Sequence, residues 1–190
     1  MGSFPWGSPA AGRETAGIYA SVGTRSRGYR AHRRADDERL LTADERVAAL
    51  GLEIPQIPEL PFRPKLRPVL VHGGLAYISG IGPIGVSGRL GEDMTVEEGY
   101  DAARTTALLA LRRILDELGS LDAVHRWVKV LGLVRSAPGF GEQPAVVNGF
   151  TDLVVEVYGE ERGLCARSAI GVSELPAGIP VEVEAVVAVR

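Results

Sequence analysis

Two segments of the chain place apolar residues three and four positions apart, which is the spacing of one face of an α-helix. The first follows the capping-box sequence Thr95-Val-Glu-Glu98 and reaches Gly119, a residue type that commonly ends helices. A helix is therefore predicted over about residues 96–118. Its apolar stripe consists of Val96, Tyr100, Ala103, Ala107, Leu111, Ile114 and Leu118. The side expected to face water carries Arg104, Arg112, Arg113, Asp116 and Glu117.

The second segment begins near Glu142, with Pro144 in its first turn, where a helix does not need the amide proton that proline lacks. The helix is expected to continue until Gly159 stops it. Its predicted buried face consists of Val146, Val147, Phe150, Leu153, Val154 and Val157. Each of the two helices therefore has one apolar face that another element must cover.

Five runs rich in β-branched and aromatic residues predict strands. Pro68–His72 and Leu75–Ser79 flank Gly73-Gly74 and predict a hairpin, because two glycines suit a two-residue turn. The other runs are Val124–Val134, Ala166–Glu174 and Pro180–Val189. The predicted order is β-β-α-β-α-β-β. The fold class is therefore α+β, with both helices packed on one face of a sheet that is not purely parallel.

A short helix and a proline-rich stretch precede the hairpin. Thr42-Ala-Asp-Glu45 is a second capping box, which predicts a helix over about 43–50 that stops at Gly51. Prolines recur between residues 53 and 68, at Pro55, Pro58, Pro61, Pro64 and Pro68. Because proline fixes φ and has no amide donor, this stretch is expected to be an extended strap laid over the surface.

The first 40 residues differ from the rest in charge and pattern. Seven arginines against four acidic residues make this segment +3, which leaves −6 for residues 41–190 within a total of −3. It shows no helical or strand period, so a disordered or loosely packed basic tail is expected over 1–40. A solvated tail and a segment that touches nucleic acid or an acidic partner both fit it. The domain is expected over 41–190, with helix and strap in 41–65 and the core in 66–190.

Composition argues against several classes of function. One cysteine and three widely separated histidines (His32, His72 and His125) predict neither a disulfide nor a protein-ligated metal. The glycine-rich segment at 80–88 lacks the pattern of a phosphate-binding loop, and no cofactor is expected. The acidic charge of residues 41–190 argues against non-specific nucleic-acid binding. The sequence contains neither an apolar run of 18 residues nor a secretory signal pattern. We therefore expect a cytoplasmic location and no membrane partner.

Three features of the last two strands suggest chemistry. Arg167 lies in an otherwise small and apolar strand, where its planar fork suits either a ligand carboxylate or a structural salt bridge to Glu182 or Glu184. These two glutamates alternate with valines and share one face, which fits solvated side chains or a carboxylate that positions a water. Cys165 shows no local activating base, so a structural thiol is favoured over a nucleophile.

Four stretches of the sequence together resemble a known family. They are Tyr77-Ile-Ser-Gly80 with Pro83, the helix that carries Asn148, Cys165–Pro176, and Val181-Glu-Val-Glu-Ala185. Over residues 66–190 the chain resembles the Rid (reactive intermediate deaminase) family, also called YjgF-like and historically L-PSP endoribonuclease-like. Residues 45–58 are similar to the leader of a subgroup of that family.

The resemblance implies a chorismate-mutase-like protomer in a homotrimer, with clefts between subunits. It implies that Arg167 grips the carboxylate of a 2-imino or enamino acid and that Glu182 holds a water near the imine carbon. Ser79, Gly80, Asn148 and Ala169 would complete the substrate site. The implied reaction is cofactor-free hydrolysis of the imine, of the 2-iminobutanoate or 2-iminopropanoate type, to a 2-keto acid and ammonia. Such an attack depends more on positioning than on a strong base.

The sequence departs from the family pattern at three pocket positions. Leu66 stands where the family has a tyrosine, Ile81 where it has a glutamine, and Ala169 where it often has a cysteine. These changes predict a less polar pocket and a larger or more apolar imine. The alternatives are a non-catalytic trimeric protein that binds small carboxylates, or a specialised biosynthetic enzyme of the same fold. A ribonuclease is disfavoured by the acidic fold and the lack of a histidine pair.

Overall fold

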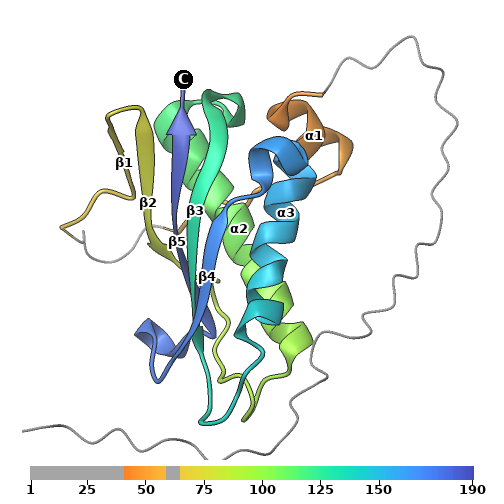
Figure 1. Cartoon of the computed structure of the whole chain (residues 1–190), viewed down its shortest axis with the longest axis vertical. Helices are drawn as coiled ribbons and strands as arrows, with labels where there is room; N and C mark the ends of the chain where they lie inside the picture. The colour runs from red at the N-terminus through yellow and green to blue at the C-terminus, as the bar shows by residue number, and fades with distance from the viewer. Residues whose placement is uncertain (1–40, 59–64) are drawn as a thin grey trace, which may run out of the picture. The chain divides into compact units, whose positions relative to one another are not determined.

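The computed structural model describes residues 41–58 and 65–190, which form three helices and five strands (Figure 1). The helices are α1 (Ala43–Ala49), α2 (Val96–Leu118) and α3 (Gln143–Gly163). The strands are β1 (Val69–His72), β2 (Leu75–Ile81), β3 (Val124–Arg135), β4 (Ala166–Val172) and β5 (Val181–Val189). This confirms the predicted α+β class and order of elements. The expected tail over 1–40 and the part of the strap at 59–64 lie outside the described residues.

The five strands form one mixed sheet in the order β1-β2-β5-β3-β4. β3 and β4 are parallel, and the other neighbouring pairs are antiparallel. The predicted hairpin is present, with Gly73 and Gly74 at φ +60° and +76°, values that favour glycine. The last strand of the chain, β5, is inserted between β2 and β3. β2 and β4 are therefore separated by two strands.

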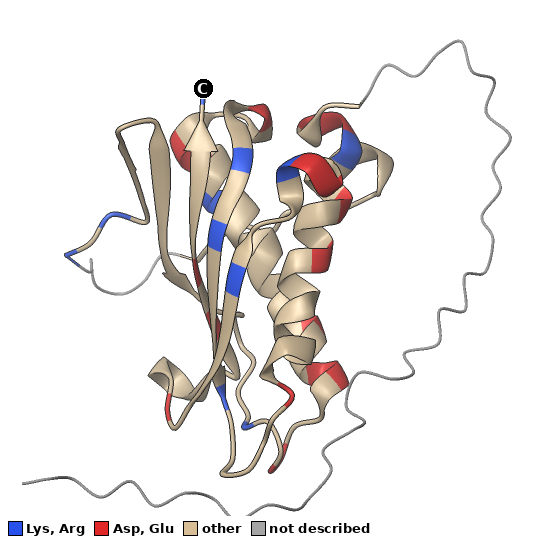
Figure 2. Cartoon of the chain, in the orientation of Figure 1, with Lys and Arg blue, Asp and Glu red and all other residues tan. Residues whose placement is uncertain are grey.

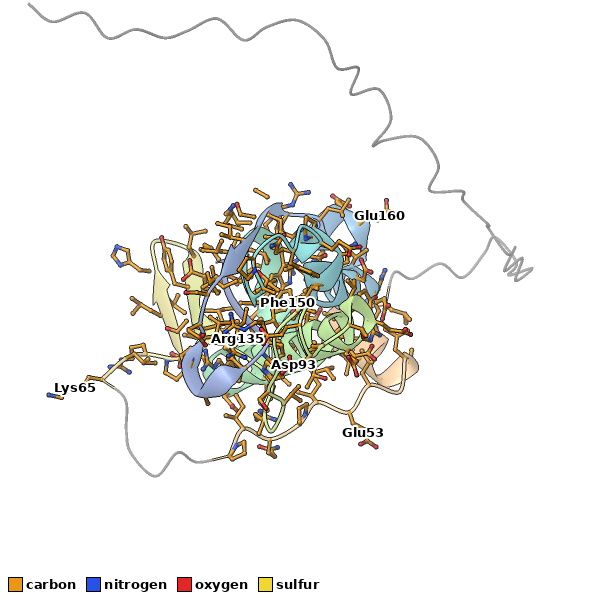
Figure 3. The ribbon with its side chains drawn as sticks, turned by 90° about the horizontal axis from the view of Figure 1, so that it is seen from below. Glu53, Lys65, Asp93, Arg135, Phe150 and Glu160 are labelled. Carbon is orange, nitrogen blue, oxygen red and sulfur yellow. The ribbon has the colours of Figure 1, made fainter. Side chains whose placement is uncertain are left out.

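Both long helices cover one face of the sheet, as predicted, and α1 lies against the end of α3 (Figure 1). Strand alternation turns Val130, Val183 and Ala185 toward the helices, where they are buried. Figure 3 shows Phe150 of α3 among the packed side chains, whereas Glu53 and Lys65 point outward. The helix-facing side of the sheet is thus the core, and none of the three described helices covers its other face (Figure 1).

The caps of the helices follow the sequence pattern closely. Both predicted capping boxes form, Thr42 with Glu45 and Thr95 with Glu98, and Gly119 ends α2 at φ +80°. Gly159 interrupts α3, with φ +73° and ψ 165°, but one more turn follows to Gly163, so the helix extends beyond its predicted end. None of the helices in residues 41–58 and 65–190 combines the length and the apolar character needed to cross a bilayer.

The packing of α3 on α2 depends on Gly149. A Cβ atom at this position would lie 2.0 Å from the carbonyl oxygen of Tyr100, which is backbone and has no rotamer to change. We expect Gly149→Ala to push the helices apart and to lower the free energy of unfolding by about 1–3 kcal/mol, measured by urea denaturation. Gly141→Ala is the control, because its added methyl group meets no atom within 4 Å. Equal stability of the two variants would contradict the close helix contact.

Candidate functional site

Arg167 lies on the edge strand β4 and is held against α3 by neutral oxygen atoms. It pairs with buried Val130 of β3, so its side chain leaves the sheet on the helix side. Its Nη1 donates to Asn148 Oδ1 at 2.8 Å and to Thr151 Oγ1 at 2.9 Å. Among the described residues, the hydrogen bond that its Nη2 makes is a long one of 3.5 Å to the carbonyl oxygen of Pro144. These bonds fix the guanidinium and leave its Nε–Nη2 edge for a further acceptor.

No Asp or Glu among the described residues forms an ion pair with Arg167. The suggested salt bridge to Glu182 or Glu184 is wrong, because both glutamates lie on the opposite face of the sheet. Glu182 is paired with Leu133 and Glu184 with Leu131, positions that alternate with the buried Val130. Figure 2 shows positive residues along β3 and β4 and acidic residues on α3. Arg167 is thus a half-buried cation without a carboxylate partner in the described structure.

Ser79, Gly80 and Glu182 form a second group, on β2 and β5. The pairing of these strands shifts between Ile78 and Ile81, so two residues of β2 bulge opposite one of β5. A Cβ atom on Gly80 would lie 2.0 Å from Glu182 Oε1, so the carboxylate occupies the space that the glycine leaves. Glu182 is half-buried, whereas Glu184 is exposed. The bulge therefore gives different surroundings to two glutamates that the sequence pattern treats alike.

Arg113 of α2 joins this second group, although the sequence pattern places it on the water-facing side. Its Nη1 donates to the carbonyl oxygen of Ser79 at 2.7 Å and to that of Gly80 at 3.3 Å. Burial lowers the pKa of Arg113, and the nearby charge of Glu182 opposes that shift. The expectation that Arg113 is solvated is wrong, because the end of β2 extends beyond its pairing with β1 and its carbonyl oxygens accept hydrogen bonds from the Arg113 guanidinium.

An apolar pocket of about 410 Å³ opens beside Glu182. It is lined by Ile57, Pro58, Gly80, Ile81, Gly82, Ile84, Leu109, Arg113, Pro176, Ala177, Ile179 and Glu182. The described end of the strap, Ile57-Pro58, is one of its walls, and Ile54 and Ile57 pack on the core as a surface strap should. Ile81 also lines the pocket, as expected for a less polar site, whereas Leu66 is 52% exposed and is not part of the lining of this pocket.

The turn on the far side of this pocket is held in place by charge. Glu174 accepts hydrogen bonds from Arg135 and Arg89, and these bonds lower the pKa of the Glu174 carboxyl. The turn that follows, Pro176–Gly178, includes Ala177 at φ +54°, an uncommon conformation for a residue with a Cβ atom. The backbone conformation of this turn therefore shapes one wall of the pocket.

Cys165 lies near Arg167 but is not an activated nucleophile. Burial raises the pKa of its thiol, and the nearby positive charges of Arg167 and Lys129 only partly oppose this effect. The thiol is free and half-buried, and with Thr151, Leu164 and Arg167 it lines a small pocket of about 130 Å³. A raised pKa disfavours the reactive thiolate, which supports the structural role favoured from the sequence.

The residues proposed from the sequence thus form two clusters within one chain. Arg167, Asn148 and Ala169 belong to β4 and α3, whereas Ser79, Gly80 and Glu182 belong to β2 and β5. Glu182 lies on β5, which β3 separates from β4, so the backbones that carry Glu182 and Arg167 are roughly 10 Å apart, and the two side chains leave the sheet on opposite faces. A small molecule cannot touch both Arg167 and Glu182 of the same chain at once.

The chain is similar in sequence and in structure to known proteins. The family model described as endoribonuclease L-PSP matches residues 63–189. Protein TCP17 from Trypanosoma cruzi is 48% identical over 102 residues, which are 54% of this chain and 64% of TCP17, less than two thirds of that relative. The crystal structure of Atu1372 from Agrobacterium tumefaciens, a protein of unknown function, is similar with a TM-score of 0.69 and 32% identity over 78% of this chain and 92% of Atu1372. A candidate endoribonuclease from Shewanella oneidensis has a TM-score of 0.72 and 26% identity over 78% of this chain and 100% of its own.

Proposed function

Since the chain belongs to the endoribonuclease L-PSP family, also called YjgF-like, we propose that it hydrolyses 2-imino or enamino acids to 2-keto acids and ammonia. The observation that carries this proposal is Arg167, a half-buried guanidinium fixed by Asn148 and Thr151 with no carboxylate partner in residues 41–58 and 65–190. A partly desolvated arginine without a counter-charge is unfavourable, and a substrate carboxylate offsets part of that cost. Its Nε–Nη2 edge offers two parallel donors for such a group.

The catalytic site is completed by a second copy of the chain, because one chain keeps Arg167 and Glu182 apart. The open face of the sheet supports this assembly, since large apolar side chains stay exposed on it: Leu70 and Tyr77 are 52% and 43% exposed, and Val128 and Ile170 are 40% and 49% exposed. Exposed apolar surface of this kind marks protein interfaces. We propose a homotrimer in which the Arg167 cluster of one copy faces the Glu182 cluster of the next.

In this site the proposed steps balance without a cofactor. Arg167 binds the carboxylate, and the imine carbon lies over the Gly80 bulge beside Glu182. Glu182 accepts a proton from a water molecule as the water oxygen bonds to the imine carbon, and it passes this proton to the imine nitrogen, which gives a carbinolamine. Glu182 then accepts the hydroxyl proton of the carbinolamine and passes it to the amine nitrogen as the C=O bond forms and the C–N bond breaks, so that ammonia leaves and a 2-keto acid remains. Positioning the water and the carbon supplies most of the acceleration.

The test is a competition for imines made in place. An L-amino-acid oxidase with catalase generates the 2-imino acid, and semicarbazide traps the part that is not hydrolysed. We expect the full chain to lower semicarbazone formation and to raise the rate of ammonia release in proportion to its concentration. A heat-unfolded sample serves as the control. If none of several 2-imino acids is hydrolysed faster, the deaminase proposal is wrong, and 2-keto acid binding without hydrolysis would identify a carboxylate-binding protein.

A further inference from the structure

We infer that the apolar pocket beside Glu182 receives the side chain of the imino acid, so that the preferred substrates carry branched aliphatic or aromatic side chains. This inference rests on the proposed function and names its substrate class. The pocket volume of about 410 Å³ lies within the range of roughly 300–1,000 Å³ that is typical of small-molecule sites. A branched aliphatic or aromatic side chain fills more of this volume than a methyl group does.

The position of the pocket relative to the reacting atoms supports this occupant. Glu182 and Gly80 both line it, and Glu182 Oε1 lies in the space above Gly80. A carbon atom placed for water attack at Glu182 is bonded directly to the first side-chain carbon of an imino acid. That side chain therefore starts at the mouth of the pocket, while the carboxylate is directed to the Arg167 cluster of the neighbouring copy.

The chemistry of the walls selects an apolar group. Ile81 comes from β2, Ile84 from the loop that follows, Leu109 from α2 and Ile179 from the segment before β5. The positive group in the lining is Arg113, and its guanidinium already donates to the carbonyls of Ser79 and Gly80. A second carboxylate in the substrate side chain would therefore meet aliphatic walls and the like charge of Glu182. Dicarboxylic imino acids should be rejected.

The pocket is tested by binding of product 2-keto acids to the full-length protein, which needs no turnover. We expect 4-methyl-2-oxopentanoate to bind about tenfold or more tightly than pyruvate in calorimetry, because each added methylene gains affinity in an apolar pocket. Ile84→Glu places a charge on a pocket residue that is 49% exposed, so folding should tolerate it, and the preference should be lost. Leu50→Glu is the matched control, since Leu50 is 48% exposed at the end of α1 and outside the pocket.

The outcomes separate this inference from the proposed function. Equal or weaker binding of the larger keto acid, no binding of either acid, or an equal loss of both in Ile84→Glu would overturn the pocket assignment. The imine assay then decides the function by itself. If the alanine-derived imine is hydrolysed faster than the leucine-derived one, the protein is a deaminase but does not use this pocket for the side chain. If neither imine is hydrolysed while the larger keto acid still binds more tightly, the pocket assignment holds and the deaminase proposal is wrong.

Discussion

Replacing Arg167 by glutamine is expected to weaken 2-keto acid binding by about a hundredfold while the fold and its assembly persist. The loss follows because a bidentate charged contact to the ligand carboxylate disappears, and truncating such a contact costs about 2–5 kcal/mol. The fold should tolerate the change, since Arg167 lies on an edge strand and the hydrogen bonds that it makes to described residues go to neutral oxygens of α3. Calorimetry measures the binding, and sedimentation velocity measures the assembly.

Two further variants test whether Arg167 binds the carboxylate in this way. Arg167→Lys keeps the charge and loses the planar fork, so it should recover only part of the affinity. Arg104→Gln is the matched control on the helix layer, because Arg104 is also half-buried but is paired with Glu156 at 2.6 Å. Removal of the Arg104 guanidinium should leave keto acid binding unchanged. Binding that survives in Arg167→Gln, or a variant that cannot assemble, would show that Arg167 is structural.

Local features of the fold were predictable because their causes are local. A capping box needs only Thr95 and Glu98, and a two-residue turn needs only the positive φ of Gly73 and Gly74. Side chains alternate along a strand, which predicts that Glu182 and Glu184 face away from the valines. The burial pattern of β5 confirms this prediction. These predictions required no knowledge of how the strands are ordered.

The partner of Arg167 was not predictable, because it depends on strand order and register. From the sequence, a glutamate of β5 and a ligand were equally reasonable partners. The insertion of β5 between β2 and β3, together with the pairing of Val130 with both Arg167 and Ala185, turns Glu182 and Glu184 to the far face. A one-residue change of register would have reversed that result, and no short sequence pattern encodes it.

Arg113 shows a different limit of the sequence pattern. Position 113 follows Leu109 and Ala110 by four and three residues, and both are buried, so the helical period does indicate a partly buried site. The charge of the residue led to the opposite expectation. An arginine occupies this position because its long side chain keeps its stem against the core while its head reaches the carbonyls of Ser79 and Gly80. A charged residue on an apolar period is therefore a useful signal for a site.

Glu182→Gln is expected to lower kcat/KM for imine hydrolysis by about 10²–10⁴, the usual contribution of a positioned acid or base. Keto acid binding should change little, because in the proposed site Arg167 rather than Glu182 holds the carboxylate. Glu184→Gln is the matched control: it lies on the same strand and the same face but is exposed, and it should retain activity. The imine competition assay measures both variants.

Gly80→Ala tests the same carboxylate without changing it. The added methyl group would lie 2.0 Å from Glu182 Oε1, the flexible end of a side chain, so the carboxylate must move while the backbone need not. We expect a fall in kcat/KM approaching that of Glu182→Gln, with little change in the free energy of unfolding, since even a side chain held about 30° from its preferred rotamer costs only about 0.5–1.5 kcal/mol. Full activity in Gly80→Ala together with a large loss in Glu182→Gln would mean that Glu182 acts from another position. The bulge at Gly80 is in contact with Glu182 and would give a special function to Glu182 alone. Similar losses of activity in Glu182→Gln and Glu184→Gln would therefore mean that the effect comes from the negative charge of the strand.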